Sequence, residues 1–213
     1  MHSEELPEVE REEEELLTPL GKMVKEGTIF SLEEIFERGY KIKEPVIVDM
    51  LLPKLREEVL FVSPVQKQTD AGEKTRFRAL VVVGDENGHV GVGMDKAAQV
   101  GDAIIKASRK ARLNMISVKR GCGSGECRCR QEHSVPFRVE GKTGSVKVVI
   151  TPAPRGLGVV AGPNAKIFLR LAGIRDAWVW TKGDTSTTQS CVYALYEALK
   201  KTFLTPLLPE HTA

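Results

Sequence analysis

Hydrophobic and polar positions divide the chain into an acidic start, a run of short helical patterns, and a longer region in which strand and helix patterns alternate. Residues 1–20 carry eight glutamates against one arginine, with Glu12 to Glu15 in one block. Such a run stays hydrated because it has little apolar surface to bury. We therefore expect an acidic, mobile tail over 1–20.

Short helical patterns fill residues 21–54. Thr18 and Pro19 form a helix start, and Ser31 with Glu34 forms a capping box for a second helix that stops at Gly39. A third pattern begins at Pro45. Each is too short to enclose a core, so we expect this helical extension to wrap around another part of the molecule.

From Val59 the apolar period changes from helical to alternating. The segment VLFVSPVQKQ predicts a strand, and KTRFRALVVVGDENGHVGVGM predicts a hairpin with Asn87 and Gly88 in its tight turn. The polar segment QKQTDAGEKTR lies between the first two strands. It fits either an ordinary mobile loop or a probe that carries Lys67, Lys74 and Arg76.

A helical pattern follows from Ala97 to Val118. Its apolar stripe contains Val100, Ala103, Ile104, Ala107 and Ala111. The opposite side carries Lys106, Arg109, Lys110 and Arg112. Six basic residues and no acidic one lie between positions 103 and 120. Since a merely solvated helix face normally mixes signs, this helix indicates contact with nucleic-acid phosphates.

Strand patterns return after position 134, with helices predicted at about 165–172 and 185–201. The fold class is therefore α+β, with two small domains, each a sheet with helices on one face. The expected organisation is an acidic tail (1–20), a helical extension (21–54), a first domain (55–120), a cysteine-bearing linker (121–134), a second domain (135–204) and a tail (205–213).

Composition narrows the class of protein. Of 213 residues, 41% are hydrophobic, which is enough for real cores, and no apolar run is long enough to cross a membrane. The start lacks a signal-peptide pattern, and four cysteines fit a reduced compartment, so we expect a soluble cytoplasmic protein. The net charge of +2 combines −7 in residues 1–20 with +9 in the remainder, which favours a polyanionic partner.

Enzyme motifs are weak in this sequence. GLGVVAG follows a strand and precedes a helix, but its glycine spacing does not fit a dinucleotide fingerprint, and GHVGVGMDK lacks the residues of a phosphate loop. The four histidines are scattered, so no catalytic triad stands out. We expect structural glycines, core or interface packing for Trp178 and Trp180, a core position for Cys191, and no enzyme; a nucleotide-binding enzyme remains a rival hypothesis.

A cysteine cluster lies in GCGSGECRCRQEH. Cys122, Cys127, Cys129 and His133 are the ligand types of a tetrahedral zinc site, although their spacing is not a common zinc pattern. Arg128 and Arg130 alternate with them and would suit a loop lying on RNA phosphates. Both interpretations stay open, and a structural zinc ion is a weak candidate rather than a required cofactor.

Two long motifs resemble a known family. GEKTRFRALVVVGDENGHVGVGMDKAAQV with AIIKASRKARLNMISV is similar to the first domain of the small-subunit ribosomal protein S-five (S5) family, and GSVKVVITPAPRGLGVVAG with LAGIRDAWVWTKG to its second domain. The helical extension and the cysteines resemble the archaeal form, since bacterial members lack these cysteines.

The resemblance implies a double-stranded-RNA-binding-like domain of three strands and a helix, followed by the family's second α+β domain. It implies a non-enzymatic constituent of the small ribosomal subunit that binds small-subunit rRNA, links head and body, and contacts protein S-four. The hairpin at residues 66–76 would point to the mRNA entry region and influence translational accuracy. No membrane or small-molecule substrate is expected; a non-ribosomal double-stranded-RNA-binding regulator is the alternative.

Positions that match the family, together with basic residues of the junction, give the expected RNA contacts. They are Lys67, Lys74, Arg76, Arg78, Lys96, Lys106, Arg109, Lys110, Arg112, Asn114, Lys119, Arg120, Arg128, Arg130, Arg155 and Lys182. The sequence departs from the family at Ser186 and Ser190, which puts contacts from that turn in doubt. Glu73 also replaces a basic or amide residue in the hairpin.

Overall fold

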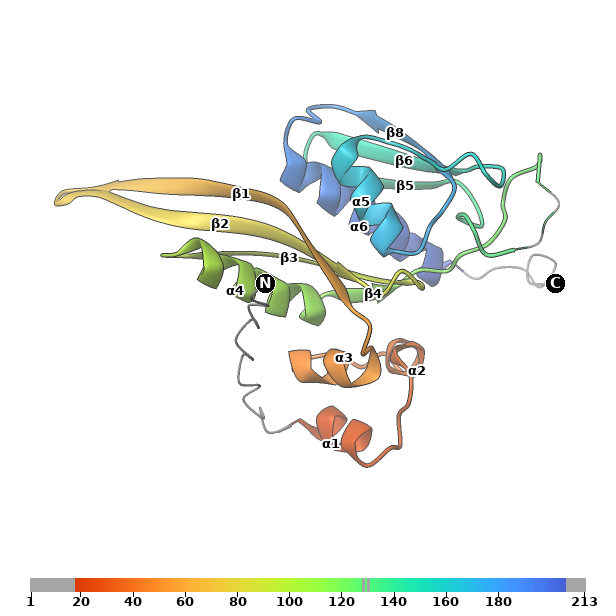
Figure 1. The fold of residues 1–213 in the computed structure, drawn as a ribbon, viewed down its shortest axis with the longest axis horizontal. Helices are drawn as coiled ribbons and strands as arrows, with labels where there is room; N and C mark the ends of the chain where they lie inside the picture. The colour runs from red at the N-terminus through yellow and green to blue at the C-terminus, as the bar shows by residue number, and fades with distance from the viewer. Residues whose placement is uncertain (1–17, 128, 130, 206–213) are drawn as a thin grey trace, which may run out of the picture.

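The computed structural model describes residues 18–127, 129 and 131–205. The expected acidic tail up to residue 17, the tail from 206, and the candidates Arg128 and Arg130 lie outside the described residues. Figure 1 shows an elongated α+β molecule with three parts: short N-terminal helices, a sheet whose first hairpin projects from the body, and a second sheet with its own helices.

The N-terminal helices are α1 (Pro19–Lys25), α2 (Leu32–Glu37) and α3 (Pro45–Leu51). Thr18 and Ser31 are confirmed as N-cap residues: the Thr18 side chain accepts from the Gly21 N–H, and the Ser31 side chain accepts from the Glu34 N–H, which is one of the two bonds of the predicted capping box. Both bonds satisfy amides that the first helical turn leaves unpaired.

These helices form a small core, which corrects the prediction that they could not. Their buried side chains come from all three helices and the loops between them, and Met115 joins them from the first domain. The buried members of the extension are Leu20, Val24, Ile29, Leu32, Ile35, Ile42, Ile47 and Val48. Short helices can form such a core because packing between them, rather than the length of each, stabilises them.

The first sheet has the order β1-β2-β3-β4, with β1 (Arg56–Thr69), β2 (Gly72–Gly84), β3 (His89–Ala97) and β4 (Met115–Ser117). Residues 85–88 connect β2 to β3, so the connection contains the predicted Asn87 and Gly88 but is longer than a two-residue turn. The segment QKQTDAGEKTR is not a loop, because β1 and β2 stay paired as far as Thr69 and Gly72.

Helix α4 (Val100–Leu113) is shorter than the predicted helix over 97–118. The chain turns back at Asn114, and β4 pairs antiparallel with β3. This short fourth strand was not predicted. Ala103, Ala107 and Ala111 bury one face of α4 against β2 and β3, whereas Val100 stays 38% exposed.

The second sheet has the order β5-β6-β8-β7, with β5 (Val139–Thr143), β6 (Val146–Pro152), β8 (Ala177–Lys182) and a two-residue β7 (Val159–Val160) parallel to β8. Helices α5 (Pro163–Leu171) and α6 (Thr188–Leu204) cover one face of it, as predicted. Its other face leaves Trp178 39% and Trp180 77% exposed, so the core alternative is wrong for both, and interface packing stays a prediction. Cys191 is buried as expected.

The two domains share one core. Leu80, Val82, Val90 and Val92 of the first sheet belong to the same buried cluster as α5, α6 and the inner face of the second sheet. Figure 1 shows the arrangement: α4 lies on one side of the first sheet, and α5 and α6 lie between the two sheets. No helix in the described part of the chain is both long and apolar enough to span a bilayer.

Candidate nucleic-acid interface and metal centre

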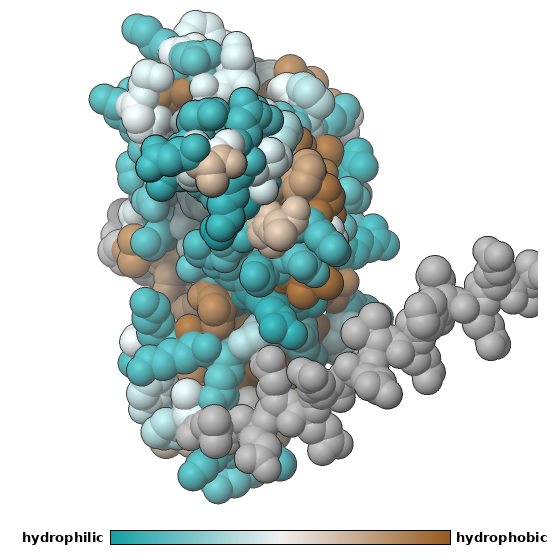
Figure 2. Space-filling view, turned by 90° about the vertical axis from the view of Figure 1, so that its left-hand side faces the viewer, coloured by the Kyte–Doolittle hydropathy of each residue, from teal (hydrophilic) through white to brown (hydrophobic). Residues whose placement is uncertain are grey.

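The paired end of β1 and β2 forms a hairpin arm beyond the body of the molecule (Figure 1). Asp70 and Ala71 make its turn, and the Thr69 hydroxyl donates to the Gly72 carbonyl at 2.7 Å. Lys67 and Lys74 are register partners, so the pairing brings their exposed side chains together near the tip. Arg76 is also exposed on the arm. Figure 2 views the molecule from this end and shows a face dominated by hydrophilic side chains.

Arg78 lies at the base of the arm and is held inside the fold. Its guanidinium donates to Gln189 of α6 at 3.3 Å and to Ser63 of β1 at 3.4 Å, and it lies 5.5 Å from the Phe61 ring centroid. Its register partner Lys96 is exposed. The arm therefore presents Lys67, Lys74 and Arg76, whereas Arg78 connects the hairpin to the second domain.

The cationic side of α4 carries three exposed residues, Lys106, Arg109 and Lys110. A fourth residue, Arg112, is less exposed and forms ion pairs with Asp49 at 2.8 Å and Glu57 at 2.5 Å. The sequence pattern placed all four on one RNA-facing side, but Arg112 joins α4 to α3 and β1.

Two further candidates next to α4 have structural partners. The Asn114 side chain donates to the Val92 carbonyl at 3.2 Å and so helps end the helix against β3. Lys119 is exposed, with its ammonium 5.5 Å from the centroid of the Phe203 ring.

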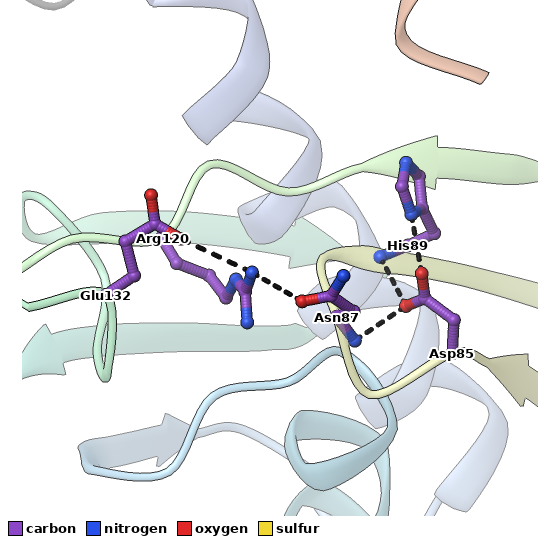
Figure 3. Close-up of polar contacts among 5 residues, drawn as sticks. All are labelled: Asp85, Asn87, His89, Arg120 and Glu132. Carbon is purple, nitrogen blue, oxygen red and sulfur yellow. Dashed lines mark hydrogen bonds and ion pairs between the residues drawn. The ribbon is translucent and has the colours of Figure 1, made fainter. Parts of the chain in front are cut away.

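Arg120 belongs to a polar network at the β2–β3 turn (Figure 3). Its guanidinium donates to the Asn87 side chain at 2.8 Å and pairs with Glu132 at 3.3 Å. Asp85 accepts from the Asn87 and His89 amides at 2.7 and 3.0 Å, and its other oxygen lies 2.7 Å from His89 Nδ1. Burial opposes ionisation of Asp85, but these hydrogen bonds outweigh it and hold its pKa below the usual value. The network connects the turn to the linker.

Two basic candidates of the second domain are exposed. Arg155 lies in the turn after β6, and Lys182 ends β8 opposite Lys147. They are separate from α4 in the chain and in the fold, so the structure does not gather all the predicted RNA contacts into one cluster.

The four metal-ligand candidates do come together. The Sγ atoms of Cys122, Cys127 and Cys129 and a ring nitrogen of His133 all lie within 4.8 Å of one another, and Cys127 Sγ is 3.8 Å from His133 Nε2. In a tetrahedral zinc site, bonds of about 2.3 Å to sulfur and about 2.0 Å to nitrogen place such atoms about 3.6 to 3.8 Å apart. This Cys3His cluster could therefore hold a zinc ion after a small contraction.

The loop around the cluster is closed at its base by two backbone bonds between Gly121 and Ser134, of 2.8 and 3.0 Å. The thiols within it differ. An amide hydrogen bond from Arg155, together with bonds from Cys129, lowers the pKa of Cys127 to about 6. Burial and the neighbouring thiols raise the pKa of Cys122 to about 11. The lowered pKa of Cys127 favours its thiolate, which is the form that binds a metal ion.

Asp176 was missed by the sequence reasoning. Its carboxylate is buried, and its Oδ2 lies 2.8 Å from His133 Nδ1, on the opposite side of the ring from the cysteines. A carboxylate in this position fixes the orientation of a metal-ligating imidazole. The pairing spans 43 positions of sequence, so no local spacing could reveal it.

Comparisons with known proteins give a consistent result. A family model described as the ribosomal protein S5 N-terminal domain matches residues 55–119, and one described as its C-terminal domain matches residues 141–205. A small ribosomal subunit protein uS5 of Hyperthermus butylicus is 60% identical over 193 residues, which cover 89% of this chain and 91% of that protein. A uS5 protein of Aeropyrum pernix is 54% identical over 208 residues, covering 97% and 95%. One of Pyrobaculum aerophilum is 56% identical over 186 residues, covering 87% and 85%.

Proposed function

Because the chain belongs to the ribosomal protein S5 family, we propose that it binds rRNA in the small ribosomal subunit, links the head and body of that subunit, and contacts protein S-four. The family consists of structural proteins of the small subunit, which confirms the expected absence of enzymatic activity. The nucleotide-binding enzyme and the free regulator both lose their basis with this membership.

The observation that carries rRNA binding is the exposed cationic side of α4. Lys106 and Lys110 lie one turn apart and are both exposed, while the other side of the helix is buried against the sheet. Lysine ammonium groups contact phosphates without reading bases. We therefore infer that binding consists mainly of phosphate contacts and depends on the shape of the RNA more than on its sequence.

The test is a salt series with rRNA fragments. Replacing Lys106 and Lys110 by alanine should weaken binding to all tested rRNA helices and reduce the slope of log K against log salt by about two. A matched control replaces Lys22 and Lys25, which are exposed on α1, and removes the same charge elsewhere. Equal losses in the two pairs, or a loss limited to one RNA sequence, would contradict the proposal.

We further propose that the hairpin arm lies near the mRNA entry region and influences translational accuracy. The projection of the arm and the pairing of Lys67 with Lys74 support this role. Subunits that carry alanine at both positions should assemble normally but show an altered frequency of misreading. Unchanged misreading in fully assembled subunits would count against the role of the arm.

Membership of a subunit and free RNA binding can be separated by washing. Small subunits washed in high salt should retain the protein, because contacts with rRNA and with S-four would act together. Release of the protein together with loosely bound factors would favour a free double-stranded-RNA-binding regulator.

We infer, finally, that the Cys3His cluster holds one structural zinc ion. The 3.8 Å separation between Cys127 Sγ and His133 Nε2 supports this, together with the carboxylate behind the imidazole. Native mass spectrometry of the purified protein should show one zinc that a strong chelator removes, and that Cys127→Ser weakens. A metal-free mass under zinc-replete conditions would reject the ion and leave the loop to be ordered by RNA.

A further inference from the structure

A cavity with positively charged walls lies where the two domains meet. Its volume is about 420 Å³, and it is lined by Lys166 and Arg170 of α5, Arg175, the segment Leu157–Val159, and Glu86 from the β2–β3 turn. Lys166 and Arg170 are spaced one helical turn apart, so their side chains emerge on the same side of α5. None of these residues was among the RNA contacts expected from the sequence.

The charge of this cavity is not neutralised from within the protein. In the part of the chain that the structure describes, the side chains of Lys166, Arg170 and Arg175 have no hydrogen-bond or ion-pair partner. Glu86 is the one acidic residue of the lining, and its carboxylate is paired with Arg56 at 2.6 Å. Three cationic side chains around one cavity favour the binding of an anion with several acceptor oxygens, such as a phosphodiester.

One wall of the cavity is held by the buried carboxylate of Asp176. Its Oδ1 accepts from the backbone N–H of Gly156 at 3.1 Å and of Gly158 at 2.7 Å. Both glycines have positive φ, at 89° and 79°, a conformation that other residues adopt only with strain. These two bonds therefore fix the turn that carries Arg155 and leads into Leu157 and Val159.

The same carboxylate touches the metal centre. Its Oδ2 pairs with Nδ1 of His133, and the His133 carbonyl accepts the N–H groups of Arg175 and Asp176 at 2.9 and 3.1 Å. Asp176 and His133 are both almost fully buried, so water cannot readily replace these bonds. His133 and Asp176 thus connect the cysteine cluster to the wall of the cavity through consecutive contacts.

We propose that this cavity is a second-domain binding site for RNA backbone phosphate, and that the metal in the Cys3His cluster sets its shape through His133 and Asp176. The second part rests on the zinc site proposed above. A metal ion on Nε2 would fix the tautomer that carries the Nδ1–H, and this group would donate to Asp176 and hold that carboxylate in place for the two glycine amides. Without metal the tautomer is not fixed, so the bond that anchors the wall weakens although the ring stays buried.

The first experiment tests the site itself, using the zinc-loaded full chain and a short duplex RNA of mixed sequence. Arg170→Ala with Arg175→Ala should reduce the slope of log K against log salt by about two. The Lys22→Ala, Lys25→Ala pair controls for the loss of two charges. No difference between the pairs overturns the site. Inorganic phosphate should compete weakly at this site; if it binds the cavity tightly while RNA affinity does not depend on these arginines, free phosphate is the ligand and RNA is not.

The second experiment tests the coupling. Asp176→Asn keeps an oxygen for the glycine amides but cannot accept from His133 Nδ1–H as the carboxylate does, so zinc affinity should fall about 10- to 100-fold. Chelation should weaken RNA binding by the wild-type chain and have much less effect on the double arginine variant, because the site that it would disturb is already gone. Hydrogen exchange at residues 156–159 should accelerate on chelation in the wild type.

The outcomes separate the two proposals. A wild-type chain that takes up no zinc rejects the metal site, while the arginine experiment still decides the phosphate site. A chain that binds zinc but shows unchanged exchange at residues 156–159 on chelation, or equal chelator effects in the wild type and the arginine variant, overturns the coupling. Equal zinc affinity of Asp176→Asn and wild type would also overturn the role of Asp176.

Discussion

At the scale of single residues, buried polar side chains connect parts of the chain that local patterns treat separately. The side chains of Asp85 and His89 are 8% and 11% exposed and belong to the same turn. Asn87 of this turn also accepts a hydrogen bond from Arg120, which is far away in the sequence. Each bond satisfies a group that would cost free energy if left unpaired. The turn between β2 and β3 is therefore a fixed junction rather than an ordinary surface loop.

Replacing Asp85 by asparagine should lower the free energy of unfolding at pH 7 by about 1 to 3 kcal/mol, because the buried His89 loses its charged partner. Since folding lowers the pKa of Asp85, its contribution is complete above the unfolded-state value of about 3.9 and is lost as the pH falls through the folded-state value. Denaturant titrations at several pH values should show the gap between wild type and variant closing below about pH 4. If the difference in unfolding free energy between wild type and variant does not change with pH, the negative charge of Asp85 does not contribute as described.

Contacts between residues far apart in the sequence also explain why the sequence could not show which basic residues are available to RNA and which are paired within the protein. Arg112 belongs to a run of cations in the sequence, but its partners Asp49 and Glu57 are 63 and 55 positions away. Arg120 is similar, with Asn87 33 positions away. Charge periodicity identifies a basic face, whereas pairing across the fold decides which of its members remain exposed to a ligand. The Cys3His set was recognisable from residue types, but its buried partner Asp176 was not.

At the scale of elements, the close approach of α4 to β3 depends on two glycines. A Cβ on Gly93 would meet the Ala107 carbonyl oxygen at 2.0 Å, and one on Gly91 would meet the Ala111 oxygen at 2.2 Å. Backbone atoms of a helix cannot move aside as a flexible side chain can. The glycines therefore let the helix lie directly on the strand, which explains why GHVGVGM carries glycine without being a phosphate loop.

Gly93→Ala should destabilise the fold by about 1 to 3 kcal/mol, because the added methyl group forces the helix away from the sheet. The matched control is Gly101→Ala in the first turn of α4, where a new Cβ meets nothing within 4 Å. That change should be neutral or stabilising by up to about 1 kcal/mol. Thermal unfolding of both variants measures the contrast; equal effects would show that the contact does not constrain the helix.

The hydrophobic pattern failed to predict β4 and the paired end of β1 and β2, where backbone pairing maintains the strands. The apolar residues Met115, Ile116 and Val118 extend the stripe of α4, so periodicity continued the helix through what is β4. In the hairpin arm, both faces are polar because neither packs on a core, and the alternation that reveals a strand disappears. Backbone pairing maintains both strands, and it leaves little trace in the sequence of side chains. The N-cap residues Thr18 and Ser31 and the place of the β2–β3 turn depend on neighbouring residues, and these were predicted correctly.

At the scale of the whole molecule, two domains in sequence behave as one packed unit in space. Phe168 of α5 is fully buried in the cluster that also contains Leu80 and Val92 of the first sheet. Neither sheet could expose its share of this cluster to water without losing hydrophobic stabilisation. The sequence indicated two α+β domains correctly, but amphipathic patterns show only that a face is buried, and not which element covers it.

A shared core predicts cooperative unfolding of the two domains. Phe168→Ala should reduce the free energy of unfolding by about 3 to 5 kcal/mol and shift a single calorimetric transition without dividing it. Phe30→Ala provides the control, because Phe30 is 77% exposed and its loss should change stability by no more than about 0.5 kcal/mol. If the calorimetric and van't Hoff enthalpies agree for both chains, the two sheets unfold together. Two separate transitions, of which Phe168→Ala shifts only one, would show instead that each domain has a core of its own.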